Sequence, residues 1–366
     1  MTYKYVIQLK FVNVKRGHIL FFGELPPRSI HGIAIANQVN IKMLKISFEV
    51  DIIEEYSKLE EHNKISINKI LNLIKNNLEI LSKSFIHGYD YFYLIFSLST
   101  FGSIKTLTAI ISFRLFNRGK VVLHIHRGDF FTRFYKTLIN RIVTKLIFGS
   151  SHKIIVLSDN QKTEFEALFK KPFNVLSNTV EFEYTKEKEY TQNCNFIFIS
   201  NYLIDKGIID LLEVFTRLTR EYQKISLQTY GSFSDQSLKD KILKYKSLNI
   251  SINGTISGVA KFKEIAQSKC LILPSWNEGQ PIIILEAMSV GTPVIASQVG
   301  LIPELLGNDY PYLTIPGDKN SLEIKIVNFI KQKKNTDISE KIKSRYIDYY
   351  SQKKHAESLH NIFVEK

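Results

Sequence analysis

Short, uninterrupted apolar segments alternate with longer amphipathic segments along most of this chain. A strand that is apolar at every position is buried on both faces, as in parallel sheets covered by helices. The pattern therefore predicts an α/β fold with two parallel sheets, one in each half of the sequence. The expected strands are 5–9, 91–96, 121–125 and 153–157 in the first half, and 195–199, 225–229, 270–273 and 293–296 in the second.

A polar stretch with several glutamates, residues 178–195, separates the two groups of strands and is interpreted as a linker. This places a first domain at 1–178 and a second domain from 179 onwards. The length of 366 residues suits two domains of ordinary size, each with its own core. In open parallel sheets ligands bind beyond the carboxyl ends of the strands. We therefore expect the functional site in a cleft between the two domains.

The segment from Tyr91 to Phe113 contains a single charge, Lys105, and is long enough to cross a bilayer. Polar and turn-forming residues interrupt it at 97–103, and its first part is β-branched and aromatic like a buried strand. A strand, a loop and a helix are therefore expected here, with a membrane span as the alternative.

Charge is unevenly distributed. The chain carries 49 Lys and Arg against 35 Asp and Glu, a net charge of +14. Residues 1–180 hold 25 basic and 13 acidic residues, and residues 181–366 hold the other 24 and 22, so +12 of the excess lies in the first half. This imbalance indicates an anionic partner for that half, such as nucleic acid, a phospholipid surface or a phosphorylated substrate. The alternative is a basic face exposed to solvent.

Composition narrows the protein class and the compartment. Apolar residues make up 44% and charged residues 23% of the chain, which excludes disordered and fibrous proteins. Cys194 and Cys270 are too few for a disulfide framework and fit a reducing cytoplasm. The N-terminal residues lead into the expected strand 5–9 without the features of a signal peptide. A cytoplasmic location is therefore expected.

The most informative stretch for chemistry is 273–288. An expected strand ends at Pro274, a loop follows, and a helix is expected to begin near Pro281, because proline has no N–H to leave unpaired in a first helical turn. The backbone N–H groups of Ile282 and Ile283 would then lie at the helix N-terminus. There they can bind a phosphate or a sugar oxygen.

Two carboxylates in this stretch, Glu278 in the loop and Glu286 in the helix, are eight residues apart and could bind two ends of one ligand. The alternative for Glu278 is an exposed loop carboxylate. The alternative for Glu286, which has apolar neighbours, is a salt-bridged core residue. A carboxylate pair could also act as acid and base in glycoside hydrolysis, but no acid stands on a separate strand here.

Two histidines, His124 and His126, share one face at the end of the expected strand 121–125. They could be hydrogen-bonded core residues or part of a metal site, for which no third ligand is evident. Downstream, residues 130–147 form a basic, aromatic-rich candidate helix. Its apolar side would either pack on the sheet or bind, with its cations, to anionic lipid headgroups.

The segment around Glu278 and Glu286 resembles the E-x7-E motif of the retaining glycosyltransferases of family 4, whose fold is GT-B, two Rossmann-like domains facing a cleft. Residues 291–297 and 300–304 are also similar to that family. The resemblance is specific over about 195–305 and general elsewhere.

Other segments resemble parts of the family's donor domain, which would occupy 179–345. Residues 198–207 resemble its first strand and loop, in which Lys206 would bind the donor diphosphate. Asn201 stands where many members have an arginine, so its hydrogen bond to phosphate would be weaker. Gly231 lies in a segment similar to the turn near the nucleotide base.

In the first domain the resemblance is looser. Residues 23–32 resemble a flexible loop in which glycine, here Gly32, lets the backbone approach the phosphates; alone, they are a Pro/Gly turn. His126 corresponds to the family's active-site histidine near the transferred sugar. Residues 346–366 resemble the terminal helix that crosses back onto the N-terminal domain.

The resemblance implies a metal-independent hexosyltransferase. It would move a sugar from a nucleoside-diphosphate sugar, UDP sooner than GDP, to an acceptor hydroxyl with retention at the anomeric carbon. No cofactor is expected, and the absence of an Asp-x-Asp pair agrees with no metal. Lys206 would neutralise the diphosphate, His126 would contact sugar or phosphate, and Glu286 would bind the ribose. The sugar hydroxyls would be bound by Glu278 with Gly279, Gln280, Pro281 and Ile282.

The acceptor would bind the basic first domain. This suits a glycan or lipid-linked glycan of bacterial surface polysaccharide synthesis, as in capsule, O-antigen or exopolysaccharide, and a peripheral position on an anionic membrane surface at the inner face of the cell membrane. Two alternatives stay open. A sugar-nucleotide epimerase would use similar diphosphate contacts. A basic nucleic-acid-binding protein would explain the charge, but no zinc-finger spacing, helix-turn-helix or RNA-binding motif occurs, so nucleic acid is not an expected partner.

Overall fold

The computed structural model describes residues 17–29, 31–55, 66–181, 194–233, 235–332 and 336–364. The chain divides into two compact units. The first unit comprises Met1–Glu181 with Gln352–Lys366, and the second comprises Phe182–Ser351. The expected strand at 5–9 and most of the expected linker lie outside the described residues.

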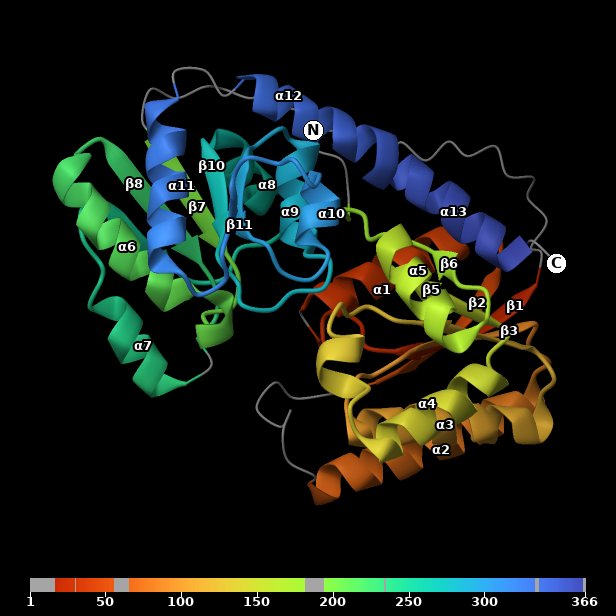
Figure 1. The fold of residues 1–366 in the computed structure, drawn as a ribbon. Helices are drawn as coiled ribbons and strands as arrows, with labels where there is room; N and C mark the ends of the chain where they lie inside the picture. Colours follow the sequence, from red (N-terminus) through yellow and green to blue (C-terminus); the bar gives the residue numbers. More distant parts are fainter. Residues whose placement is uncertain are drawn as a thin grey trace. The chain divides into compact units, whose positions relative to one another are not determined.

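The first unit contains a six-stranded parallel sheet with the strand order β2-β1-β3-β4-β5-β6 (Figure 1). Its central strands are apolar on both faces, as the sequence predicted. In β3, Phe92 and Leu94 pack into one core and Tyr93 packs into the other. The strands are β1 His18–Gly23, β2 Glu49–Glu54, β3 Tyr91–Ile95, β4 Lys120–His124, β5 Lys153–Val156 and β6 Asn174–Val175.

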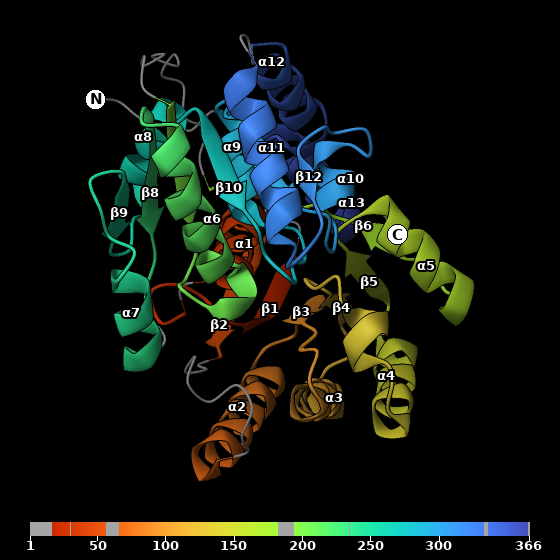
Figure 2. The same ribbon diagram turned by 60° about the vertical axis from the view of Figure 1, so that its left-hand side comes forward.

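Helices cover both faces of this sheet. In Figures 1 and 2, α2, α3 and α4 lie together on one face, and α1 and α13 lie on the other. Side chains at the N-caps fix where several helices begin, because Ser66, Ser99, Thr137 and Ser158 each accept a hydrogen bond from the first turn. The helices are α1 Gly32–Leu44, α2 Ile67–Ile86, α3 Thr100–Phe116, α4 Leu138–Ser150, α5 Asp159–Phe169 and α13 Gln352–Val364.

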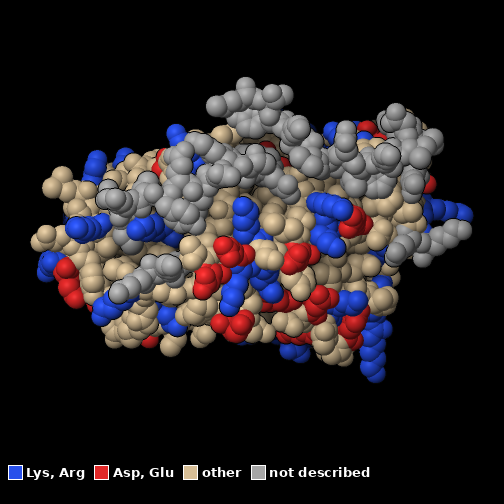
Figure 3. Space-filling model, turned by 90° about the horizontal axis from the view of Figure 1, so that it is seen from above, with Lys and Arg blue, Asp and Glu red and all other residues tan. Residues whose placement is uncertain are grey.

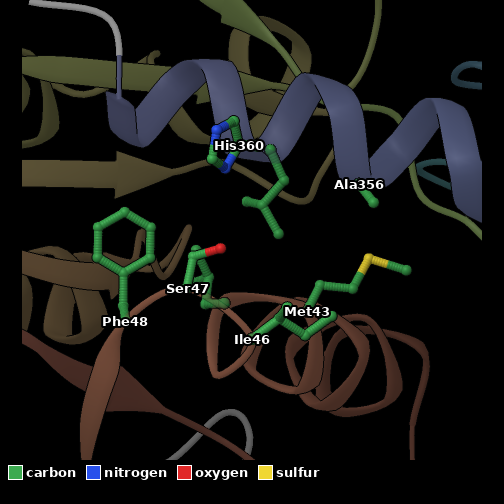
Figure 4. Close-up of a pocket in the computed structure, with 8 residues that line it drawn as sticks. Met43, Ile46, Ser47, Phe48, Ala356 and His360 are labelled. Atoms are coloured by element: carbon green, nitrogen blue, oxygen red, sulfur yellow. The ribbon is translucent and has the colours of Figure 1, made fainter. Parts of the chain in front are cut away.

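Helix α13 comes from the far end of the chain and is bound to the first unit by polar contacts. Gln352 Nε2 donates to the carbonyl of Val180 at 3.0 Å, and Lys153 Nζ donates to that of Ile362 at 2.6 Å. Between α13 and the end of α1 lies a cavity of about 20 Å³, lined by residues such as Phe48 and Ala356 (Figure 4). This volume holds about one water molecule, so the cavity is a packing gap and no ligand site.

The second unit contains another six-stranded parallel sheet, with the order β12-β11-β10-β7-β8-β9. Helices α6 and α11 lie on one face of it, and α8 and α9 lie on the other (Figures 1 and 2). The strands are β7 Cys194–Ile199, β8 Ile225–Tyr230, β9 Ile250–Asn253, β10 Cys270–Leu273, β11 Val294–Ser297 and β12 Leu313–Thr314. The helices are α6 Ile208–Glu221, α7 Gln236–Leu243, α8 Gly258–Gln267, α9 Ile282–Ser289, α10 Ile302–Leu306, α11 Lys319–Lys331 and α12 Thr336–Arg345.

Two predicted elements need correction. The single helix expected over 130–147 is a π-helix at Phe130–Phe134 followed by α4. The break arises because Asn140 donates its side-chain amide to the carbonyl of Phe134 while Thr137 caps the new helix. The terminal helix begins at Gln352. A separate π-helix at Tyr346–Tyr350 precedes it and packs on α9 in the second unit. The helix expected to begin near Pro281 is confirmed as α9, with Pro281 as its N-cap.

The segment 91–113 is the strand and helix that were expected, β3 and α3. Among the residues that the structure describes, no helix combines the length and the apolar content that crossing a membrane requires.

Candidate functional site

Two loops meet beyond the carboxyl ends of β7 and β10, which are neighbours in the sheet of the second unit. The loop after β7 leads through a short 3₁₀ helix, Ile204–Lys206, into α6, and the loop after β10 leads into α9. The backbone N–H of Trp276 donates to the carbonyl of Asp205 at 2.8 Å. The topology therefore brings together side chains from two separate loops at the edge where parallel sheets bind ligands.

Lys206 and Glu278, one from each loop, form an ion pair with 2.8 Å between Nζ and Oε1. The Glu278 side chain is only 11% exposed and that of Lys206 is 23% exposed, so Glu278 is not the exposed loop carboxylate of the alternative interpretation. A carboxylate that accepts hydrogen bonds and an ammonium that donates them thus lie side by side at this edge. Together they can bind both a sugar hydroxyl and an anion.

Glu286 is buried on α9, with a 2% exposed side chain, and forms an ion pair with Lys261 of α8 at 2.5 Å. This partner agrees with the interpretation of Glu286 as a salt-bridged core residue. The pair is close to the surface on one side, since the Lys261 side chain is 14% exposed. A ligand hydroxyl could therefore reach the pair without opening the core. Sequence reasoning missed Lys261, because no local pattern marks a lysine whose partner lies on the next helix.

The loop before α9 is held by the backbone of the segment that follows β11. The N–H of Leu301 donates to the carbonyl of Gly279 at 3.0 Å. Gly300 has a φ of +53°, and a Cβ there would lie 2.0 Å from the carbonyl oxygen of Glu278. Only glycine permits this approach. Gln280 is buried, and Ile282 begins α9, so its N–H lies at the positive end of the helix dipole.

Asn201 and Gly231 lie where the ends of β7 and β8 meet. The side-chain oxygen of Asn201 accepts a hydrogen bond from the hydroxyl of Ser232 at 2.8 Å. A Cβ on Gly231 would lie 2.1 Å from the carbonyl oxygen of Ser200, so glycine is required for the two segments to pack. Asn201 lies in the loop after β7 that is described above, and Gly231 directly follows the neighbouring strand β8.

The remaining predicted site residues belong to the first unit. His126 lies just after β4, buried, with its ring 3.8 Å from that of His124. Burial lowers the pKa of His126 to about 3 and lowers that of His124 well below its ordinary value, so both are neutral at pH 7. Gly32 is the first residue of α1, and a Cβ there would meet nothing within 4 Å. Its glycine is therefore not required by packing.

A buried polar network extends from His124 to α13. His124 Nδ1 lies 2.7 Å from the hydroxyl of Tyr93, which lies 3.0 Å from the side-chain nitrogen of Asn40. The ring nitrogens of His355 lie 2.7 Å from the side-chain oxygen of Asn40 and from the carbonyl oxygen of Ser177. Within the described ranges no three His, Cys, Asp or Glu side chains are grouped as a metal site.

The second unit is similar to known proteins. Residues 180–345 match the family model "Glycosyl transferases group 1". An uncharacterized glycosyltransferase of Methanocaldococcus jannaschii is 28% identical over 229 residues, which cover 55% of this chain and 55% of that protein. The chain thus spans about half the length of this relative.

Solved structures resemble the whole chain in fold. Sucrose-phosphate synthase from Thermosynechococcus elongatus matches with a TM-score of 0.73 at 15% identity, over 95% of this chain and 98% of that one. A mutant of S. aureus TarM, in complex with fondaparinux, alpha-GlcNAc-glycerol and UDP, matches with a TM-score of 0.64 at 20% identity, over 80% of this chain and 59% of that one. Two six-stranded parallel sheets covered by helices are the architecture that these structures share with it. Residues 180–345 are thus similar to the group 1 glycosyl transferases, in a chain with the GT-B fold.

Proposed function

We propose that this protein is a retaining, metal-independent hexosyltransferase that transfers a sugar from a nucleoside-diphosphate sugar to an acceptor hydroxyl. The observation that carries the proposal is the pairing of Lys206 with Glu278 at the joined ends of β7 and β10. The match of the same unit to the group 1 glycosyl transferases supports the reaction class.

Each group at this edge has a part in the proposed reaction. The bond between the anomeric carbon and the diphosphate oxygen breaks, and a bond from the acceptor oxygen to the same carbon forms. The acceptor proton passes to the departing phosphate, so no side chain is needed as a general base. Lys206 and the N-terminus of α9 stabilise the negative charge that develops on the diphosphate.

The two carboxylates would orient the donor. Glu278 accepts hydrogen bonds from hydroxyls of the transferred sugar, and its pairing with Lys206 fixes its position before the donor arrives. Glu286 accepts hydrogen bonds from the ribose while Lys261 neutralises its charge in the protein interior. His126, buried and neutral, is proposed to contact the sugar or the phosphate from the first unit.

The proposal also names the donor base and the acceptor. A UDP donor is favoured because the fold neighbour TarM was solved with UDP and a glycoside. We propose a glycan or lipid-linked glycan of surface polysaccharide synthesis as acceptor, bound by the basic first half of the chain at the inner face of the cell membrane. A peripheral, cytoplasmic position is part of this proposal.

Thermal unfolding with UDP, GDP, ADP and their common sugar conjugates tests the donor. A nucleotide at 100 times its Kd should stabilise the folded chain by about 2.7 kcal/mol. Activity that survives EDTA, with a product whose anomeric configuration matches the donor, is expected. Stabilisation by none of the nucleotides, or rearranged free sugar released without an acceptor, would overturn the proposal.

A further inference from the structure

Helix α2 exposes most of its large apolar side chains, unlike an ordinary surface helix. Its buried residues are Asn76, Ile80 and Ser84. A helix at a water interface normally buries its apolar stripe. The exposed side chains include Ile67, Ile70, Leu71, Ile74, Leu78 and Phe85.

Polar contacts hold α2 in this orientation. Asn77 donates its side-chain amide to the hydroxyl of Thr108 on α3 at 3.3 Å and accepts from Ser112 at 2.8 Å. These bonds satisfy polar groups between the two helices. These bonds and the burial of Ile80 in the core fix which side of α2 packs inward, and most of its other apolar side chains face outward.

Helix α4, on the other side of α3, also has an exposed apolar face. It buries Asn140, Thr144, Ile147 and Phe148 and exposes four other large apolar residues. Helix α3, which packs against both, exposes Ile111, Leu115 and Phe116 near its end. The exposed apolar residues of α4 are Leu138, Ile139, Ile142 and Leu146.

Helices α2, α3 and α4 lie together at the bottom of Figures 1 and 2, and their exposed apolar side chains form a patch on this layer of the first unit. Of the 27 large apolar side chains that are exposed on described residues, fifteen lie on these three helices. A concentration of this kind on one face indicates a binding surface.

The same helices are strongly basic. They carry seven Lys and Arg residues and one acidic residue, Glu79, and one of the seven, Lys105, is paired with Glu55 in the interior. On the face shown in Figure 3, by contrast, Lys and Arg lie interspersed with Asp and Glu. The other six cations of the three helices are Lys69, Lys75, Lys83, Arg114, Arg141 and Lys145.

Cations also border a groove at one end of this face. The groove has a volume of about 490 Å³. Apolar side chains such as Leu138, Ile142 and Leu168 line it together with the cations Arg141 and Lys145. Apolar walls with two cations beside them match the chemistry of an acyl chain below a phosphate headgroup.

We propose that α2, α3 and α4 dock this protein on a bilayer that contains anionic lipids. The exposed apolar side chains enter the boundary between headgroups and acyl chains, and the flanking Lys and Arg bind lipid phosphates. A second copy of the chain fits this face less well, because a symmetric contact would place the cations of both copies together. The proposal deepens the acceptor side of the proposed function, and it does not depend on which nucleotide the second unit binds.

Sedimentation of the full chain with vesicles tests the docking. Binding is expected to vesicles of phosphatidylcholine with phosphatidylglycerol, to weaken with added NaCl, and to be much lower with phosphatidylcholine alone. The double variants Leu71→Gln/Ile74→Gln on α2, Leu138→Gln/Ile142→Gln on α4 and Arg141→Gln/Lys145→Gln should each lower the vesicle affinity about tenfold or more.

A matched control comes from the second unit. Leu248→Gln/Ile324→Gln replaces two exposed apolar residues there and should leave vesicle binding unchanged. Thermal unfolding verifies that each variant folds, and nucleotide binding, measured separately, should be unaffected by all of them. A wild-type chain that ignores anionic vesicles overturns the proposal. So does a control that loses as much binding as the α2 and α4 variants, or a stable dimer in light scattering that the α2 and α4 variants dissociate.

Discussion

The Nζ of Lys206 lies 2.8 Å from Oε1 of Glu278, although 72 residues separate them in the sequence. The contact follows from topology, because β7 and β10 are parallel neighbours and each residue stands in the loop after one of them. In the free protein the two charges neutralise and position each other. A donor that binds here as proposed would meet an ammonium and a carboxylate already in place.

Removing the Lys206 ammonium should therefore act on the reaction more than on the fold. We expect Lys206→Ala to lower kcat about 10²–10³-fold, as removal of one fixed donor to a developing charge does. Lys206→Arg, which keeps the charge, should retain more of the rate. Initial rates of sugar transfer, measured with the donor that the nucleotide screen identifies, decide this.

The control for that variant is another lysine in an ion pair. Lys319 binds Glu213 at the same 2.8 Å, but both side chains are substantially exposed. Lys319→Ala should leave kcat unchanged. If Lys206→Ala were equally silent, Lys206 would be a surface residue and its role in the proposed mechanism would be wrong.

Glu286 and Lys261 allow a test that separates a structural role from a binding role. Glu286→Gln leaves the largely buried ammonium of Lys261 without a carboxylate, which should lower the free energy of unfolding by about 3 kcal/mol. The double variant Glu286→Gln/Lys261→Gln should recover part of that loss. Chemical denaturation measures both changes.

Nucleotide affinity, measured by calorimetry on the same variants, supplies the second readout. If Glu286 binds the ribose, the affinity stays low in the double variant even where stability recovers, since the carboxylate is still missing. Full recovery of affinity together with stability would leave Glu286 as a core residue only.

The fold was predictable where burial dictates the pattern. The central strands β3, β4, β7 and β10 are mostly apolar because helices cover both of their faces, and they were found from that pattern. Strand β2 was missed because it lies at the sheet edge, half exposed, where charged residues alternate with apolar ones. Strand β1 was missed as well, although its six residues are mostly buried.

The site was predictable only in part, and for a different reason. The loop between β10 and α9 is continuous in sequence, so Glu278 and the start of α9 could be found from local signals. The partners of its carboxylates could not, since Lys206 and Lys261 depend on which strands and helices are neighbours. The exposed apolar face of α2 was equally hidden, because periodicity does not reveal which face of a helix packs inward.

Gly300 should be sensitive to the smallest substitution. In Gly300→Ala the new methyl group would lie 2.0 Å from the carbonyl oxygen of Glu278, at a φ of +53° that alanine disfavours. We expect a loss of about 1–3 kcal/mol in stability and weaker nucleotide binding, as the Glu278 loop is displaced. Gly149→Ala, in α4 with open space around it, should instead stabilise the chain slightly. Equal thermal midpoints for the two variants would contradict this account of the loop.

Three buried histidines should make the first unit sensitive to acid. Burial lowers the pKa of His126 to about 3 and that of His355 to about 4, and it lowers that of His124 as well, from an ordinary value of 6.5. The unfolded chain takes up protons near that value while the folded chain does not. The three histidines therefore contribute their full stabilisation above about pH 6.5. Below it the free energy of unfolding falls by about 1.4 kcal/mol per pH unit for each histidine, until the pH reaches the pKa of that histidine in the folded chain.

Thermal unfolding between about pH 7.5 and pH 4.5 should show this slope. His355→Gln should reduce the slope. A midpoint independent of pH over this range would rule out the buried, neutral state of the three rings.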